Sequence, residues 1–159
     1  MILAVLMAAS AMCAPEQARY VLREDPAITA RFLTVEASSD WPSGIALRLH
    51  SSRTGKDYDF LPWSGGSDGA QHLASTGDVT APHWGLPSPD DGAARPLGDV
   101  TYIATDEHYT LLAVPPGRGV QAPAHILIPD LREALWYRTG PDARESTTKQ
   151  FFDRVGCDH

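Results

Sequence analysis

Alternating apolar and polar residues predict β-strands in the first half of the chain. From Ile45 to His50 the alternation is strict, so Ile45, Leu47 and Leu49 share one face. Arg48 and His50 share the other face. A strand with one buried and one solvated face has this period of two residues. Further strand candidates are residues 28–36, 58–60, 100–105, 109–114 and 124–128.

Turn signals join some of these strands into hairpins. A polar stretch at 51–56 precedes the resumed alternation at Tyr58 and Phe60, and predicts a first hairpin. A second hairpin is predicted across residues 106–108. Between the two hairpins, residues 64–98 are crowded with Gly, Pro, Ser and Asp and are predicted to be mostly loop. Because loops of this length are uncommon in compact domains, this one is a candidate functional segment.

The tail of the chain carries helix signals. Thr147 and Gln150 have the spacing of a capping box. Phe151 and Val155 then fall on one helical face, and Gly156 can take the left-handed conformation that ends a helix. The sequence therefore predicts a short C-terminal helix.

Length and organisation indicate one domain. A chain of 159 residues fits a single domain, and nothing in it repeats at a fixed period. Residues 130–136 fit either a short helix or a strand. We therefore predict a single β-rich domain over residues 15–159, mainly β, built as an antiparallel sandwich or open barrel with a short C-terminal helix.

The first eleven residues, MILAVLMAASA, form an apolar run. The run suits the core of a signal peptide and is shorter than the roughly 20 residues of a membrane-spanning helix. Small residues predict cleavage after Ala11, or as late as Ala14. No Lys or Arg precedes the run, so a buried first strand or helix is the alternative. We predict a signal peptide over residues 1–11 and a periplasmic or secreted mature protein without a transmembrane span.

Two cysteines, Cys13 and Cys157, would lie near opposite ends of the mature chain. In an oxidising compartment we predict that they form a disulfide. Two alternatives remain open. Cys13 could be the lipidated cysteine of an envelope lipoprotein, although Met12 is larger than the residue that usually precedes one. Cys13 could also leave with the signal peptide, and Cys157 would then be a lone thiol.

Composition and charge narrow the classes of partner. The formal net charge is −7, and the 13 Lys and Arg residues are scattered along the chain. This argues against nucleic acid and against an anionic membrane surface, because both bind clustered cations. The chain has no Asn and only Lys56 and Lys149 against 11 Arg, a bias that indicates a GC-rich, bacterial genome.

The stretch at 65–69 matches G-x-S-x-G, which can present Ser67 as a nucleophile. Asp106 and His125 follow in the chain order of an α/β-hydrolase. The expected context of alternating strands and helices is absent, so a solvated loop is the favoured interpretation. For His125, a hydrogen-bonded core histidine is favoured over a catalytic one.

Histidines and acidic residues do not have the spacings of a metal or calcium motif, so we predict no metal and no cofactor. Trp41, Trp63 and Trp84 adjoin Pro or Gly and are the candidate ligand-binding or partner-binding residues. The alternative is that these rings cover the end of the core. Binding, if present, is expected around Trp63, Trp84 and the loop between them.

These features favour an exported, non-enzymatic protein that binds an unknown protein or small ligand through its central loop. A small acidic exported domain suits an inhibitor or immunity-type protein that meets a cationic surface. The alternatives are a small serine hydrolase that uses Ser67 and an envelope lipoprotein anchored through Cys13.

Overall fold

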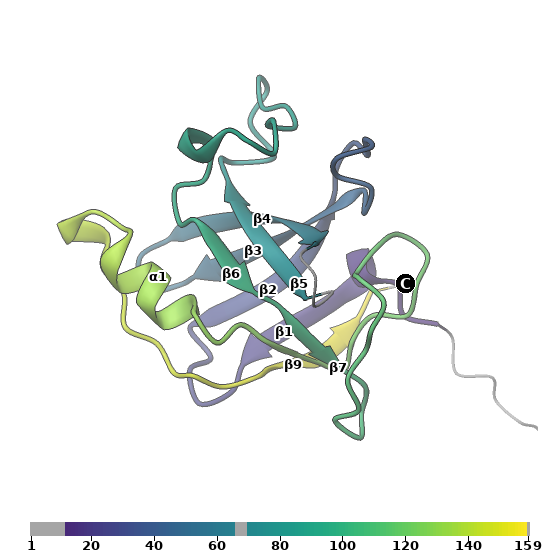
Figure 1. Ribbon diagram of the computed structural model, residues 1–159. Helices are drawn as coiled ribbons and strands as arrows, with labels where there is room; N and C mark the ends of the chain where they lie inside the picture. The colour runs from purple at the N-terminus through teal and green to yellow at the C-terminus, as the bar shows by residue number, and fades with distance from the viewer. Residues whose placement is uncertain (1–11, 66–69, 159) are drawn as a thin grey trace, which may run out of the picture.

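The computed structural model describes residues 12–65 and 70–158, and this part of the chain forms one antiparallel sheet of nine strands (Figure 1). The strand order is β6-β5-β4-β3-β2-β1-β9-β8-β7. The strands are β1 (Ala18–Leu22), β2 (Ile28–Thr34), β3 (Ile45–Ser51), β4 (Lys56–Ser64), β5 (Gln71–Thr76), β6 (Asp99–Thr101), β7 (Ile103–Thr105), β8 (His125–Leu127) and β9 (Phe152–Cys157). The helical elements are α1 (Leu131–Tyr137) and 3-10 turns at Pro15–Gln17, Gly92–Ala94 and Pro141–Ala143.

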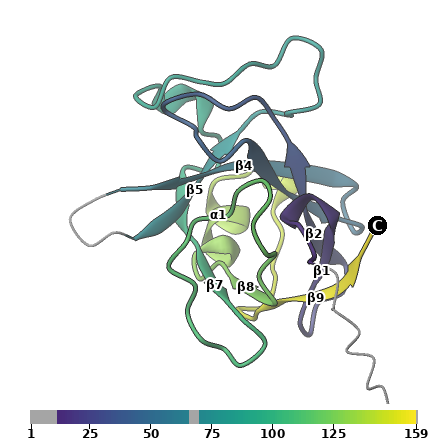
Figure 2. The same cartoon turned by 90° about the vertical axis from the view of Figure 1, so that its right-hand side faces the viewer.

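The two ends of the sheet adjoin each other in the sequence. At one end β6 pairs with β5, at the other end β7 pairs with β8, and Tyr102 alone separates β6 from β7. The chain therefore passes from one end of the sheet to the other within one residue, and the sheet curls into a nearly closed barrel (Figure 2). Closure of this kind removes most exposed strand edges. The predicted mainly β, antiparallel fold is confirmed.

The first hairpin follows the predicted alternation. Leu47 on β3 lies opposite Phe60 on β4, and Leu49 lies opposite Tyr58. These side chains point into the barrel and belong to or pack against its main core. Gly55 completes the turn with φ +68°, a conformation that glycine adopts without steric cost.

Helix α1 closes one end of the barrel (Figures 1 and 2). Leu131, Ala134 and Leu135 are spaced three and four residues apart, so they share one helical face, and all three join the main core. Of the two structures that fitted residues 130–136, the chain adopts the helix.

The predicted helix over 147–156 is wrong, because Phe152–Cys157 forms strand β9. β9 fills the gap between β1 and β8, so a helix here would leave both of those strands with an unpaired edge. Thr147 does not cap a helix: its hydroxyl donates to Asp25 at 2.7 Å. The capping-box spacing of Thr147 and Gln150 would stabilise a helix only locally. Hydrogen bonds to two neighbouring strands and the burial of Phe152, which is 1% exposed, stabilise the strand more.

Two other segments also differ from the prediction. Residues 64–98, expected to be mostly loop, contain β5, whose residues pair with both β4 and β6. Residues 109–114, expected to be a strand, contribute only one isolated bridge, between Thr105 and Leu111, within the described chain. Tyr109 has φ +62°, which breaks the extended conformation that a strand requires.

A second, smaller cluster of buried side chains lies on the outer face of β3, β4 and β5, which faces away from the barrel core. We call it the outer cluster. The segment before β3 and the long loop after β5 supply its remaining side chains. Its members are Val35, Trp41, Ala46, Leu61 and Ala74, with Trp63, Val79, Trp84 and Leu86 partly buried against them. The central loop is therefore packed against the sheet along part of its length.

The predicted disulfide between Cys13 and Cys157 is confirmed, with Cα atoms 5.9 Å apart. It ties the segment before β1 to the end of β9 and joins residues 144 positions apart in the chain. The predicted signal peptide at 1–11 lies outside the described residues. Within residues 12–65 and 70–158, no helix is long and apolar enough to cross a membrane.

Candidate functional site

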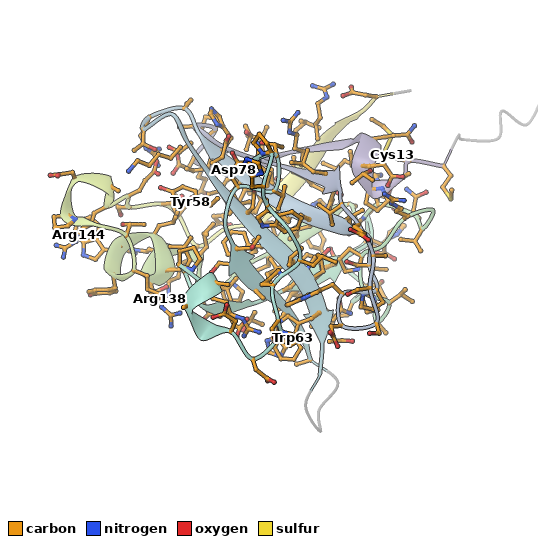
Figure 3. All side chains as sticks on the ribbon, turned by 90° about the horizontal axis from the view of Figure 1, so that it is seen from above. Cys13, Tyr58, Trp63, Asp78, Arg138 and Arg144 are labelled. Atoms are coloured by element: carbon orange, nitrogen blue, oxygen red, sulfur yellow. A yellow bond between two sulfur atoms is a disulfide. The ribbon has the colours of Figure 1, made fainter. Side chains whose placement is uncertain are left out.

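The three candidate tryptophans pack in or against the outer cluster. Trp41 is 3% exposed, and its indole N–H donates to a backbone carbonyl of the long loop at 2.8 Å. Trp84 donates to Oγ1 of Thr76 at 3.1 Å. Trp63 lies near the end of the β4–β5 hairpin (Figure 3). Its ring stacks on that of His72, with centroids 4.7 Å apart. The Trp84 contact holds the long loop on β5, and a ligand-binding role for the three rings stays a prediction.

Of the three weak catalytic candidates, His125 contacts an acid other than Asp106. Nδ1 of His125 lies 2.7 Å from Oδ1 of Asp153 on β9. Asp106 accepts hydrogen bonds from two backbone N–H groups of its own turn, at 2.8 and 2.9 Å. Ser67 lies outside the described residues. The hydrolase hypothesis therefore stays a prediction.

The surroundings of His125 indicate a structural role. The ring of Tyr109 stacks parallel on its imidazole, with centroids 4.3 Å apart. Arg23 donates to the Tyr109 hydroxyl at 2.6 Å and to both carboxylate oxygens of Asp153. The Arg23 hydrogen bonds, and then that of His125, hold the pKa of Asp153 below its usual value. This cluster fixes the turn after β7 to strand β9.

Three arginines, which we call the arginine row, lie side by side across neighbouring strands. Arg31 on β2 is directly opposite Arg19 on β1 and directly opposite Arg48 on β3. Residues paired in this way point to the same face of an antiparallel sheet. Their strand neighbours Tyr20 and Ala30 are buried in the barrel core, so the arginine row lies on the outer face.

Arg48 is compensated by three carboxylates. It binds Asp59 through two hydrogen bonds of 2.7 and 2.6 Å and Asp78 through one of 2.6 Å, and Asp57 lies 3.5 Å away. Hydrogen bonds from Thr80 and then from Arg48 lower the pKa of Asp78 to about 2. The Arg48 side chain is only 8% exposed, and a charge so buried requires paired partners of this kind.

The other two arginines of the row differ from each other. Arg19 donates to Asp158 at 3.0 Å and lies over Gly156, where a Cβ would stand 2.5 Å from the guanidinium. The Arg31 side chain is exposed, and its guanidinium has no hydrogen-bond or carboxylate partner in the part of the chain that the structure describes. Arg31 is therefore the uncompensated charge at the centre of the row.

A hollow of about 400 Å³ lies over the arginine row. Besides the arginines, the polar residues that line it are Thr29, His50 and Asp57. The apolar residues that line it and are exposed or half-buried are Val21 and Val155. His50 Nδ1 lies 2.7 Å from Oδ1 of Asp57. Volumes of this order accommodate small ligands, and a free guanidinium favours an anionic group by charge-assisted hydrogen bonding.

This site is not evident from the sequence, because its arginines are scattered along the chain. They form a row only when the register of β1, β2 and β3 is known. The alternation of 45–50 does place Arg48 on the polar face, and the same reading of residues 28–34 places Arg31 on a polar face. An antiparallel pairing of these two strands in the correct register would have placed Arg31 beside Arg48 and indicated the site.

A second hollow, of about 370 Å³, lies within the loop between β7 and β8. Its lining is mainly apolar and includes Leu111 and Val114, both largely exposed. The charged side chains on it are Asp106 and Glu107, and Glu107 is paired with Arg154 at 2.8 Å. Because both carboxylates already have hydrogen-bond partners, this hollow offers a ligand less specific recognition than the arginine row does.

No protein-family model, curated protein or solved structure matches the chain. Among residues 12–65 and 70–158, no group of three or more His, Cys, Asp or Glu side chains is arranged to hold a metal ion. The fold and the site describe a small disulfide-linked, nearly closed β-barrel with a hollow over the arginine row on its outer face.

Proposed function

We propose that this protein is an exported, non-enzymatic binding protein that holds an anionic ligand in the hollow over the arginine row. The uncompensated charge of Arg31 carries the proposal. Like charges directly opposite each other on neighbouring strands destabilise a sheet. Arg48 and Arg19 have carboxylate partners that offset this cost, whereas Arg31, between them, has none among residues 12–65 and 70–158.

The central loop, through which binding was expected from the sequence, supports the proposal less well. Its tryptophan Trp84 and the neighbouring Trp41 donate their indole N–H groups within the protein. Donors and apolar rings already used in packing have less to offer a ligand than an exposed guanidinium has.

Export is the second part of the proposal. A disulfide between Cys13 and Cys157 supports an oxidising, extracytoplasmic compartment. The bridge also bears on the lipoprotein alternative, because lipidation of a lipoprotein uses the same Cys13 sulfur. A molecule with the disulfide cannot carry a thioether lipid on Cys13. Mass spectrometry of the mature protein is expected to show a Met12 N-terminus, and a diacylated Cys13 would contradict the proposal.

Isothermal titration calorimetry with phosphate, sulfate, acetate and citrate tests the binding function. We expect saturable binding that weakens as salt is raised, because the recognising charge is exposed. Arg31→Gln should reduce the affinity by about two- to fivefold, since one exposed charge-assisted contact is removed. The matched control is Arg132→Gln, an exposed arginine of α1 outside the hollow, which should bind like the wild type. Equal binding by Arg31→Gln and wild type would reject the site.

A further inference from the structure

We infer that the ligand is an amphiphilic anion, in which a phosphate, sulfate or carboxylate group carries a short apolar chain. This inference rests on the proposed anion site and names the class of molecule that the site selects. Three features of the hollow carry it: a β-bulge, the position of one carboxylate, and the exposure of Arg31.

The β-bulge aims an apolar side chain into the hollow. Between β1 and β9, Arg19 pairs with Gly156 and Tyr20 pairs with Arg154, so Val155 is left as the extra residue. Bulges of this kind redirect side chains. Val155 is 58% exposed and lines the hollow beside Val21 of β1. The β1–β9 side of the hollow is therefore an apolar wall next to the arginine row.

Asp57 makes the two sides of the hollow electrostatically different. It lies on the β3–β4 side, opposite the valines, and it contacts both His50 and Arg48. A ligand anion is repelled by this carboxylate and attracted by the free guanidinium of Arg31. The anionic group is thus held at the centre of the row, and the rest of the ligand extends toward Val21 and Val155.

The exposure of Arg31 explains why the apolar wall matters. An ion pair in open solvent contributes little to affinity, because water and salt screen it. Burial of an apolar chain adds affinity in proportion to the area removed from water. A bare anion is therefore bound weakly, and an anion with an apolar chain is bound more tightly by the same site. A hollow of about 400 Å³ has room for such a chain.

Calorimetry with methyl phosphate and with monomeric octyl phosphate tests this inference, because the two probes share the anionic group. We expect octyl phosphate to bind about tenfold tighter or more. Neutral octyl glucoside should not bind measurably. Val155→Ser should weaken the binding of octyl phosphate far more than that of methyl phosphate, and so remove most of the octyl gain. Val155→Thr keeps the shape of the side chain and serves as the second variant should the serine variant fail to fold.

The outcomes separate the inference from the proposed function. Equal affinity for the two phosphates would overturn the amphiphile and leave the anion site standing. No binding of either probe, or binding that Arg31→Gln does not weaken, would overturn both. Loss of octyl phosphate binding with Val114→Ser, but not with Val155→Ser, would place the chain in the loop hollow and would also overturn the inference. Sedimentation with phosphatidylglycerol vesicles, without binding of octyl phosphate, would point to a membrane surface and overturn it.

Discussion

Arg31 lies directly opposite Arg48 across the β2–β3 ladder, yet within the described part of the chain Arg48 has carboxylate partners and Arg31 has none. The difference follows from position. Arg48 lies beside β4 and the long loop, which supply Asp59 and Asp78, whereas Arg31 lies between two arginine-bearing strands. The fold thus leaves the Arg31 charge exposed on the outer face of the barrel, without a carboxylate partner among residues 12–65 and 70–158.

Arg31→Gln should stabilise the protein at low salt. Removing the central charge of the row relieves its repulsion with Arg19 and Arg48, a gain of about 0.2–1 kcal/mol in the free energy of unfolding. The gain should shrink as salt is added. Urea unfolding at low and high salt measures it, with Arg132→Gln as the control. A clear loss of stability in Arg31→Gln would show that the side chain serves packing instead of binding.

Loss of the disulfide should lower stability strongly. The bridge joins residues 144 positions apart, and in the chain-entropy model a loop of this size contributes about 4–5 kcal/mol. Urea unfolding of Cys13→Ser/Cys157→Ser against wild type tests this, and reductant should lower wild-type stability without affecting the double variant. Both cysteines of the native protein should also resist thiol labelling until reduced. Rapid labelling under native oxidised conditions would contradict the bridge.

Arg53→Gln should destabilise the protein at neutral pH by about 2 kcal/mol. Arg53 contacts Asp25 at 3.0 Å and the buried Glu145 at 3.1 Å, so the variant leaves carboxylates without their cation. The expected loss in the free energy of unfolding is smaller than for a fully buried ion pair, because the Arg53 side chain is 41% exposed. Unfolding by urea at pH 7 measures the loss. Wild-type stability in the variant would show that the contacts are not important.

Acid should weaken the wild-type protein in a defined direction. Hydrogen bonds from Arg53 and then from Thr147 lower the pKa of Asp25. Hydrogen bonds from Arg23 lower the pKa of Asp153. The pKa of Asp78 is lowered to about 2 by hydrogen bonds from Thr80 and Arg48. Carboxyls with a lowered pKa in the folded state stabilise it above their unfolded pKa of 3.8, and this contribution is lost as pH falls toward 2. Urea midpoints should therefore fall steeply below about pH 4. The Arg53→Gln variant should show a shallower fall, and an equally steep one would contradict this assignment.

Two neighbouring substitutions distinguish strand β9 from the helix that the sequence indicated. Phe152→Ala should cost about 3–5 kcal/mol, because the ring is buried in the barrel core. Val155→Ala should cost well under about 1 kcal/mol, because its side chain is largely exposed. A helix with Phe151 and Val155 on its buried face would give the opposite order. Thermal or urea unfolding of the two variants decides between them.

The sequence predicted the elements whose residues alternate and lie next to their partners in the chain. The β3–β4 hairpin is such a case, because Leu47, Leu49, Tyr58 and Phe60 meet across a short turn. β9 could not be predicted in this way. Its partners β1 and β8 are distant in the chain, so a local capping pattern at Thr147 was the stronger signal. Non-local pairing decides such segments, and short windows of sequence do not contain it.

The disulfide was predictable because only two cysteines are present and both lie near the ends of the domain. The arginine row was not, since a one-residue slip of register would move Arg31 to the barrel interior. Scattered arginines along the chain argued against a cluster of cations, and the sheet nevertheless brings three of them together. Charge clusters on β-barrels depend on register as much as on composition.

The proposed function requires that the Arg31 guanidinium binds the anion. Two-dimensional NMR of the arginine side-chain Nε–Hε signals, during titration with methyl phosphate, observes this group itself. We expect a saturable shift of the Arg31 signal, with the Arg132 signal unchanged. The absence of a saturable shift at Arg31, or an equal drift of every arginine signal, would contradict the account.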